Sequence, residues 1–495
     1  MDQLKTLPRA ATRATAIVDI VIERDSDTGL VEQIARKIAE AIAAGRLAAG
    51  AKLPSVRDMA RQLAVSTFTV AGAYDLLTAR HVVAARRGAG YFVLHRGPAA
   101  TATLMEPAQT EASSISDFWL SSDVFTHGRM LASPGCGWLP SDWYSERTVI
   151  SDAIRRVARS KPEHLVNYGH PAGYGRLRQH IARDLSERLF ALSPDQIVLT
   201  HGVTHALDLV VRTCLQPGDA VLVESPGYSN LNGLIARHGC KLLPVTRGPN
   251  GLDLEAAAQL AQTHRPKAMF VTTVLHNPLG TTLRPTDAFR LLALAEKFDF
   301  LIVEDDICRS FGSDFDPCLA AMDGLSRVIS VNGYSKTIAP SLRAGYVACN
   351  AKLVQDILRT KMVTGLTTSE VSERIVLEVL ADPSHRRSVE RIRTRMTAAR
   401  EAYRVVLEAA GLTLLAAADG GMFLSAGWAV APTDTCNARL IAEDALKDGL
   451  ALAPGDFFHV SPPESIWFRF NVAHEDPDRL RAFLSEVPAR YGWSL

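Results

Sequence analysis

Lys336 lies in a sequence environment that predicts covalent chemistry. An apolar, strand-like run within residues 330–343 leads into this lysine, and Arg343 follows seven residues later. A lysine amine condenses with an aldehyde only when part of it is unprotonated, which a desolvated pocket or a neighbouring cation promotes. Arg343 adds such a cation, and its guanidinium fork suits a phosphate group. The pattern is typical of a pyridoxal phosphate (PLP) site in which Lys336 forms the Schiff base.

Two upstream segments predict polar groups for the same cofactor. Residues 300–306 are an apolar run that ends in acids, which is the pattern of a buried parallel strand whose carboxyl end meets a ligand. We expect Asp305 to lie against the pyridine nitrogen of PLP, because a carboxylate there keeps the ring protonated. A second apolar run, residues 267–273, leads to Asn277, whose amide suits a phenolic oxygen. Asn277 also precedes a proline, which is an ordinary turn signal.

The order and spacing of these segments resemble the fold type I PLP enzymes, the aspartate aminotransferase superfamily, over residues 116–495. This resemblance implies an α/β fold with a mostly parallel sheet. It also implies a role for each matching residue: Lys336 carries the Schiff base with Ser335 beside it, Asp305 holds the ring nitrogen, Asn277 holds O3′, Tyr228 stacks on the ring, Val203, Thr204 and Arg343 hold the phosphate, Tyr168 reaches the phosphate of the partner subunit, and Arg469 clamps a carboxylate.

Each of the weaker matches has an ordinary structural explanation. Tyr168 and Tyr228 are compatible with half-buried aromatics, and Thr204 with a helix N-terminus. Arg469 alternates with apolar neighbours in a strand-like run, so a solvent-facing arginine is the alternative there. The joint occurrence of all these motifs in the family order favours the cofactor interpretation above all for Lys336, Asp305, Asn277 and Arg343.

Two departures from the family pattern weaken the expectation of an efficient enzyme. Where the family usually places a tyrosine that donates to O3′, this chain has Ile307 and Cys308. A thiol is only a weak donor. Gly333 stands where the family usually has Ser or Thr against the phosphate.

The N-terminal part predicts a different domain. Apolar residues every four positions over residues 30–42 indicate one face of a helix. Ser55, with Asp58 three residues later, approximates a capping box at the start of a second helix, and Ser66 suits the cap of a third. Residues 82–93 then form a hairpin with glycines and two arginines at its tip. Together these elements indicate a helix-turn-helix with a wing.

Residues 33–93 resemble the winged helix-turn-helix of the GntR regulators. The resemblance implies binding to double-stranded DNA, through a set of residues at the two helices and the wing: Arg57, Ser66, Thr67, Phe68, Thr69, Arg86 and Arg87. Thr67 departs from the family, which commonly has arginine after the capping serine. Phe68 suits contact with a thymine methyl group or packing against a neighbouring helix.

Charge and composition agree with two domains. Residues 1–96 contain fourteen Lys and Arg against nine Asp and Glu, a net of +5, whereas the whole chain carries +1. The basic part is therefore N-terminal, where we expect the DNA. Residues 97–115 lack periodicity and have a linker composition. We expect three parts: a DNA-binding domain over residues 1–96, a flexible linker over residues 97–115 and a PLP-binding domain over residues 116–495.

The remaining composition limits the cellular setting. Seven scattered cysteines without a Cys-x-x-Cys pair indicate a reducing compartment and no metal site. No signal-type segment or membrane-spanning apolar stretch is evident. We therefore expect a cytoplasmic protein that does not bind membranes.

This layout resembles the MocR family of bacterial transcription regulators along nearly the whole chain. The resemblance implies a homodimer that binds an operator and senses a small amine or amino acid through external aldimine formation at the cofactor. One alternative is a working PLP-dependent aminotransferase with a DNA-binding appendage. Another is a repressor whose large domain no longer binds PLP, which the presence of Lys336, Asp305, Asn277 and Arg343 disfavours.

Overall fold

The computed structural model describes residues 22, 29–43, 46–80, 82–86, 89–94, 132–144, 147–188, 190–474 and 476–493. Contacts divide the chain into two compact units, Met1–Ala112 and Ser113–Leu495. The predicted linker, residues 97–115, lies outside the described residues, as does Arg87 in the predicted wing.

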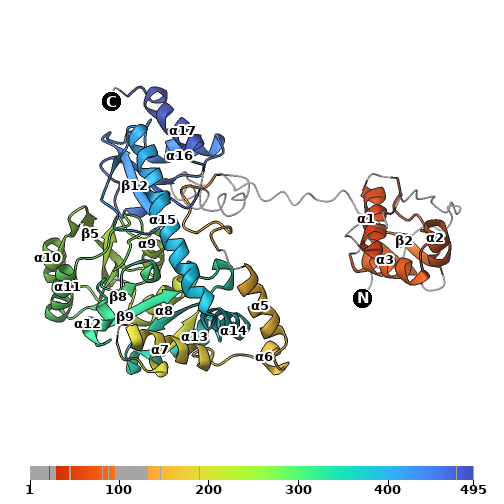
Figure 1. Ribbon diagram of the computed structural model, residues 1–495, viewed down its shortest axis with the longest axis horizontal. Helices are drawn as coiled ribbons and strands as arrows, with labels where there is room; N and C mark the ends of the chain where they lie inside the picture. The colour runs from red at the N-terminus through yellow and green to blue at the C-terminus, as the bar shows by residue number, and fades with distance from the viewer. Residues whose placement is uncertain are drawn as a thin grey trace. The chain divides into compact units, whose positions relative to one another are not determined.

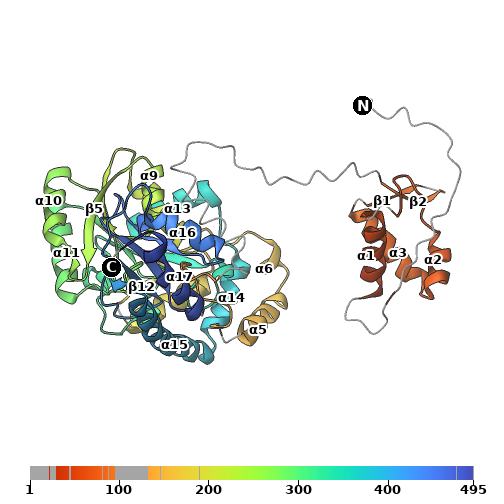
Figure 2. The ribbon, with the colours of Figure 1, turned by 90° about the horizontal axis from the view of Figure 1, so that it is seen from above.

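The N-terminal unit is a winged helix-turn-helix, as predicted. Three helices lie beside a short antiparallel hairpin (Figures 1 and 2). The helices are α1 Leu30–Ala43, α2 Val56–Leu63 and α3 Thr67–Ala79, and the hairpin strands are β1 Val83–Arg86 and β2 Gly90–Val93. The hairpin aligns Val83 with Val93, and both side chains are buried. Ile34, Ile38 and Leu77 join them in one apolar core. Burial of this core, and not helix propensity alone, stabilises helices this short.

Serine caps define where α2 and α3 begin. The Ser55 hydroxyl accepts a hydrogen bond from the Asp58 backbone N–H at 3.2 Å, and Ser66 does the same for Thr69 at 3.0 Å. Both serines have extended backbone angles, as an N-cap requires. The buried Tyr74 hydroxyl donates to the Pro54 carbonyl at 2.9 Å. This bond ties α3 to the segment before α2 and fixes the turn between the two helices.

The larger unit is built on a mostly parallel sheet of the predicted class. Its strand order is β3-β10-β9-β8-β7-β4-β5-β6, and neighbouring strands from β9 to β5 run parallel, whereas β10 and β6 are antiparallel to their neighbours. The strands are β3 Ile197–Thr200, β4 Ala220–Ser225, β5 Lys241–Gly248, β6 Gly251–Leu252, β7 Ala268–Thr272, β8 Leu301–Asp305, β9 Val328–Gly333 and β10 Gly345–Ala348.

Helices cover both faces of this sheet, so its central strands are apolar on both sides. Alternate residues of one strand enter different cores, as Val221 and Leu222 do. One core includes side chains of α8 Val203–Cys214, α9 Ser229–Arg237 and α13 Ala351–Gly365. The other includes side chains of α5 Arg147–Ala158, α7 Gly175–Arg188, α10 Leu254–His264, α11 Pro285–Phe298, α12 Leu319–Asp323 and α14 Glu370–Leu380, while the short helix α6 Glu163–Val166 has no buried residue.

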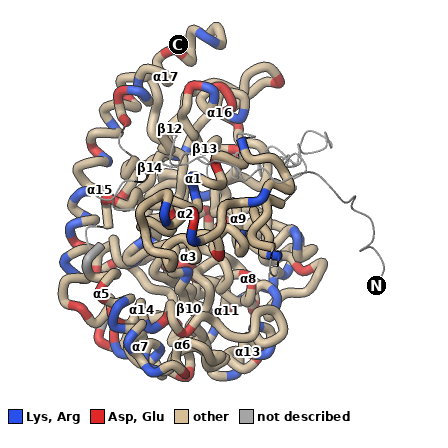
Figure 3. Tube along the Cα trace, turned by 90° about the vertical axis from the view of Figure 1, so that its right-hand side faces the viewer, with Lys and Arg blue, Asp and Glu red and all other residues tan. Residues whose placement is uncertain are grey.

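A second, antiparallel sheet follows the long helix α15 Pro383–Ala409. Its order is β11-β12-β14-β13, with strands β11 Thr413–Leu414, β12 Phe423–Trp428, β13 Ala453–Pro454 and β14 Ile466–Asn471. Helices α16 Ala438–Lys447 and α17 Pro477–Arg490 contribute to its apolar core. Arginines and fewer glutamates are spread along α15 (Figure 3), and some of them form exposed i,i+3 and i,i+4 ion pairs.

Among the described residues, no helix is long and apolar enough to cross a membrane. The same residues hold no group of three or more His, Cys, Asp or Glu arranged to bind a metal ion.

A buried arginine joins three parallel strands near their carboxyl ends. Arg247, on β5 and only 2% exposed, forms an ion pair with Glu224 on β4. Its guanidinium also donates to the carbonyls of Thr272 at 2.6 Å and Thr281 at 3.1 Å. Burial disfavours ionisation of Glu224, but Arg247 and His276 outweigh it and lower the pKa of this carboxyl to about 2. Arg247 thus holds both ends of the loop between Thr272 and Thr281.

We predict that Arg247→Met lowers the free energy of unfolding of the larger unit by about 3–5 kcal/mol, because Glu224 and two carbonyls lose their buried partner. All six tryptophans lie in residues 119–493. Tryptophan fluorescence during urea unfolding therefore reports on this unit alone. The matched control is Arg155→Met, which breaks an exposed pair with Asp152 and is expected to cost less than about 1 kcal/mol. Equal losses for the two variants would contradict the prediction.

Candidate functional site

One large cavity, with a volume of about 670 Å³, opens where several strands of the main sheet end. Every cofactor and carboxylate residue predicted from the sequence lines it except Tyr168, namely Val203, Thr204, Tyr228, Asn277, Asp305, Ser335, Lys336, Arg343 and Arg469. They come from the start of α8, the segments after β4, β7 and β9, the end of β8, the segment before β10, and the second sheet at β14. A cavity at the carboxyl ends of parallel strands is the usual ligand position in such folds.

One end of the cavity is built for an anion. Helix α8 begins at Gly202, and no side chain of the described residues caps it there. The backbone N–H groups in the first turn of α8, together with the positive end of the helix dipole, therefore favour an anion at this end of the cavity. Gly202 has φ +79°, and a Cβ at this position would lie 2.8 Å from the Arg343 guanidinium. Arg343 in turn donates to the His201 carbonyl at 3.0 Å. Glycine therefore suits this left-handed position, and its missing Cβ leaves room for Arg343.

The acidic end of β8 directs one of three carboxylates into the cavity. Glu304 is fully buried and accepts hydrogen bonds from the backbone N–H groups of Leu319 and Ala320, both at 2.9 Å. Asp306 pairs with the buried Arg309. Asp305 lies between them, on the opposite side of the strand, and lines the cavity. The alternation of side chains along β8 explains why Asp305 alone faces a ligand.

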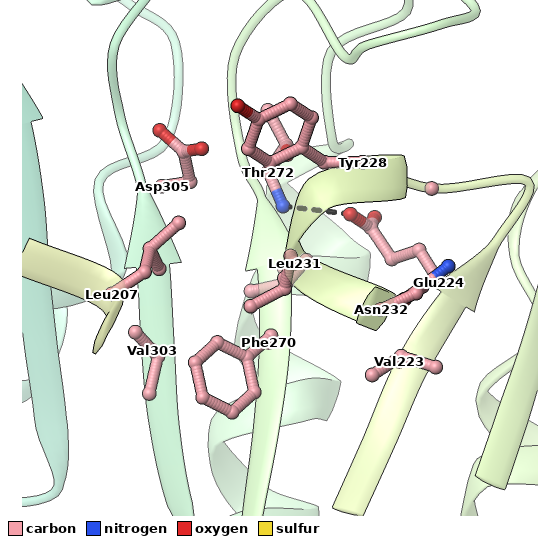
Figure 4. Close-up of a pocket in the computed structure, with 12 residues that line it drawn as sticks. Leu207, Val223, Glu224, Tyr228, Leu231, Asn232, Phe270, Thr272, Val303 and Asp305 are labelled. Atoms are coloured by element: carbon pink, nitrogen blue, oxygen red, sulfur yellow. Dashed lines mark hydrogen bonds between the residues drawn. The ribbon is translucent and has the colours of Figure 1, made fainter. Parts of the chain in front are cut away.

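Asp305 and Tyr228 lie at the same end of the sheet. In Figure 4 both stand above an apolar layer that includes Val303 and Phe270. Burial raises the pKa of Asp305 to about 6, although the Ile307 backbone N–H, at 3.2 Å, opposes the rise. Asp305 has no ion-pair partner among the described residues. A protonated ring nitrogen beside this carboxylate would supply the missing cation.

Lys336 follows β9 and points into the cavity. Burial lowers the pKa of its amine, and the nearby Arg469 lowers it further. Its Nζ donates to the Gly137 carbonyl. The preceding residue, Ser335, has its carbonyl held by the Tyr144 hydroxyl at 2.9 Å. These contacts fix the backbone around Lys336 and favour the neutral amine that condensation with an aldehyde requires.

Arg469 is buried on β14 instead of facing solvent. Its side chain is 7% exposed, and its guanidinium lies between the rings of Phe423 and Phe458, 4.5 and 4.8 Å from their centroids. It donates to Asn277 Oδ1 at 2.9 Å and to the Gly135 carbonyl at 2.6 Å, while its Nε has no partner. Burial lowers its pKa to about 10. No acidic residue of the described chain pairs with this guanidinium, so the site suits a carboxylate.

Two of the three residues that depart from the family pattern line the cavity. They are Ile307 and Cys308, and neither side chain carries the phenol hydroxyl that the family usually has at this position. Gly333 has a steric explanation, because a Cβ there would lie 3.0 Å from the Ala344 carbonyl and 3.3 Å from Val203.

Tyr168 lies apart from this cavity. It follows α6 and is 83% exposed. One further segment lines the cavity although it belongs to no regular element, and it was not predicted from the sequence: Gly135, Cys136, Gly137 and Trp138. Its glycines were the available signal, because Gly135 lies so close to the chain at Leu452 and Ala453 that no Cβ fits.

In the N-terminal unit, the predicted DNA-contact residues fall on α2, the start of α3 and the hairpin. Arg57 on α2 and Phe68 on α3 are exposed, Phe68 to 89%. Ser66 and Thr69 are joined by a hydrogen bond of 2.7 Å between their hydroxyls, and Thr67 beside them is exposed. Arg86, at the end of β1, lies over the Phe92 ring at 4.7 Å.

Comparison with known proteins agrees with both units. Residues 142–487 match the family described as aminotransferase class I and II, and residues 30–93 match the bacterial regulatory proteins of the gntR family. The fold resembles Pyrococcus horikoshii kynurenine aminotransferase at a TM-score of 0.69, with 22% identity over 78% of this chain and 96% of that one. It also resembles the α-aminoadipate aminotransferase LysN of Thermus thermophilus at a TM-score of 0.66, with 22% identity over 76% and 96% of the two chains. Similarity at this level shows the fold alone.

Relatives with both parts are transcription regulators. The chain is 28% identical to the uncharacterized HTH-type transcriptional regulator YdcR of Escherichia coli, over 90% of this chain and 96% of that protein. It is 29% identical to the probable rhizopine catabolism regulatory protein MocR of Rhizobium meliloti, over 90% of each chain.

A gntR-type helix-turn-helix joined to an aminotransferase fold defines a class of DNA-binding proteins built on a PLP enzyme scaffold. The chain belongs to the aminotransferase class I and II family and, with its N-terminal unit, to the MocR-type transcription regulators. It is a PLP-binding transcriptional regulator. The cavity fits this cofactor, since it offers an anion cradle at Gly202, an unpaired carboxylate at Asp305 and a desolvated amine at Lys336.

We predict that PLP attaches covalently to Lys336, because burial keeps its amine partly neutral. Borohydride reduction of the PLP-loaded protein followed by peptide mapping is expected to place the cofactor on the peptide that contains Lys336. Lys336→Ala is expected to lose this product and its visible absorption band. Lys352→Ala, which removes an exposed lysine, is the matched control. Label on another lysine, or an unchanged band in Lys336→Ala, would contradict the prediction.

Proposed function

We propose that this regulator senses a small amine or amino acid in the PLP cavity and changes its affinity for operator DNA in response. The observation that carries the proposal is Arg469, a buried guanidinium that faces the cavity without an acidic partner in the described chain. A buried charge of this kind is costly unless a ligand neutralises it. A carboxylate on the effector would do so.

The proposed roles follow from the contacts of each residue. When bound, PLP supplies an aldehyde that condenses reversibly with a primary amine. Lys336 would hold the cofactor and give up this position to the amine of the effector. Asp305 would neutralise the ring nitrogen. Asn277 has its Oδ1 occupied by Arg469, which leaves its amide N–H groups to donate to the cofactor oxygen.

The phosphate and ring of the cofactor would be held by the rest of the predicted set. Arg343 and the first-turn amides at Val203 and Thr204 form the anion cradle. Tyr228 would stack on the ring, with its hydroxyl positioned by the Asn230 side chain at 3.1 Å. Ser335 would support the turn that carries Lys336.

We also propose a cytoplasmic homodimer with three parts: residues 1–96 for DNA binding, residues 97–115 as linker and residues 116–495 for cofactor and effector. Tyr168 supports the dimer, because it is exposed and lies outside the cavity of its own chain. A second subunit would bury this side chain and let its hydroxyl reach the cofactor phosphate in the partner's cavity.

DNA contacts are proposed for the residues of the winged unit that the sequence predicts. Arg57 and Arg86 would bind phosphates, together with Arg87, whereas Ser66, Thr67, Phe68 and Thr69 would present the start of α3 to the bases. Phosphate contacts position the protein, and base contacts specify the sequence.

We predict that Arg57→Ala and Arg86→Ala each weaken binding to all DNA sequences and reduce the slope of log affinity against log salt by about one unit. Fluorescence anisotropy over several salt concentrations measures this slope. Arg36→Ala is the control, since Arg36 lies on α1 beside Glu40 and is expected to leave the slope unchanged. An unaltered slope in Arg57→Ala and Arg86→Ala would exclude these arginines as phosphate contacts.

The sensing proposal predicts that a saturating effector changes both the absorption of the bound cofactor and the DNA affinity, the latter by about 5- to 150-fold, as is usual for allosteric coupling. A panel of amines and amino acids, titrated into the PLP-loaded protein with and without labelled DNA, tests this. We expect conversion of the cofactor to its amine form to be slow, because Cys308 stands where a phenol would donate.

The competing function is an aminotransferase. The 2-aminoadipate transaminase of Thermus thermophilus is 28% identical over 72% of this chain and 89% of that protein. Turnover of about 1 per second or more with an amino acid and a keto acid, together with a DNA affinity that does not change with that amino acid, would favour the enzyme.

Arg469→Gln tests whether the effector is an amino acid or an amine without a carboxylate. This variant is expected to lower the affinity for an amino acid relative to the corresponding decarboxylated amine.

A further inference from the structure

The outward side of α3 presents an aromatic ring and few polar groups. Phe68 is 89% exposed, Thr67 beside it is exposed, and Asp75 is exposed seven residues later. Val70 and Tyr74, on the opposite side, are buried in the core of the unit. Every residue of α3 is described, and the helix contains no Lys, Arg, His, Asn or Gln. The side chains that form paired hydrogen bonds with guanine or adenine are therefore absent from it.

The remaining hydroxyls of α3 are largely engaged. Ser66 and Thr69 bond to each other through their hydroxyls at 2.7 Å while Ser66 caps the helix. Thr78 donates to the Tyr74 carbonyl at 2.8 Å. At the start of the helix, only the Thr67 hydroxyl has no such bond to a neighbouring turn. The first turns of α3 thus offer the bases mainly apolar surface, formed by Phe68 and, three residues later, by Ala71.

The positive charge of the unit lies on the elements beside α3. Arg57 and Arg61 are on α2, Arg86 ends β1, and Lys52 lies within 6.0 Å of the Phe92 ring in β2. Cations in these positions suit the phosphate backbone on either side of a helix that enters a groove. The exposed Phe68 ring at the start of that helix then faces the base edges, because the N-terminal residues of a recognition helix make the base contacts.

We propose that Phe68 and Ala71 recognise thymine C5-methyl groups in the major groove and that this apolar contact sets the base preference of the protein. The C5-methyl of thymine is the apolar group that the major groove displays. Contact would bury the Phe68 ring, which is otherwise left in water. The inference rests on the proposed DNA contact of α3, and its test separates failure of that contact from failure of methyl recognition.

The test uses the full-length, PLP-loaded protein and a duplex that it selects from a random-sequence pool. Each thymine of the selected duplex is replaced in turn by deoxyuridine, which removes the methyl group and keeps the base-pair hydrogen bonds. We expect at least one position in each half-site to weaken binding about fourfold, as expected when one methyl group is no longer buried. Fluorescence anisotropy at fixed salt measures the dissociation constants.

A double-mutant cycle assigns the effect to Phe68. Phe68→Ala is expected to weaken binding to the thymine duplex and to abolish the difference between thymine and deoxyuridine at the sensitive position. Phe289→Ala removes another exposed phenylalanine, on α11 of the larger unit, and is expected to preserve that difference. The exposure of Phe68 means that folding of the variant is preserved, which circular dichroism verifies.

Three results would overturn the inference. Deoxyuridine without effect at every position would exclude methyl recognition. A Phe68→Ala variant that binds like the parent would exclude Phe68. An equal loss on both duplexes would show that Phe68 acts through protein packing or by wedging between bases. If Arg57→Ala and Arg86→Ala also leave DNA binding unchanged, the proposed DNA surface itself fails.

Discussion

The buried guanidinium of Arg469 lies at the wall of the cavity with no acidic partner among the described residues, and the chemistry of the site depends on it. Removing such charges from water is costly. Arg469 is stabilised by two carbonyl-type acceptors and by the rings of Phe423 and Phe458, and burial lowers the pKa of the Lys336 amine in the same cavity. The contacts of Arg469 do not neutralise its charge as a bound anion would. We therefore expect anionic ligands to stabilise the cavity, such as the phosphate of PLP and the carboxylate of the proposed effector.

Buried polar contacts next to the cavity hold the loops that line it. Arg247 fixes both ends of the loop that carries Asn277, and Asn277 in turn accepts from Arg469. A ligand that neutralises Arg469 would therefore act on a chain of hydrogen bonds from β14 to the end of β7. For this to change DNA affinity, the ligand must bind two arrangements of the chain with different affinities. The coupling free energy equals that difference, whatever route it follows.

Local patterns predicted much of this site. The apolar run ending in Glu304-Asp305-Asp306 predicted the strand end, and alternation along β8 explains why Asp305 rather than its neighbours lines the cavity. The serine caps of α2 and α3 were likewise visible in the sequence because capping is local. Arg247, Phe423, Phe458 and the segment around Cys136 were missed, since their roles depend on contacts between residues far apart in the chain. Arg469 illustrates the limit: its strand was recognisable, but only packing of the second sheet against the first determines that it is buried.

Thermodynamic reciprocity gives the most direct test of sensing. If effector binding in the cavity changes DNA affinity by some factor, saturating DNA must change effector affinity by the same factor. We would titrate an amino acid into the PLP-loaded protein, following the cofactor absorption, with and without saturating selected duplex. Coupled sites predict that the two dissociation constants differ by about 5- to 150-fold and that this ratio equals the change in DNA affinity measured in the reverse titration. Identical dissociation constants with and without DNA would contradict a sensory role for the cavity.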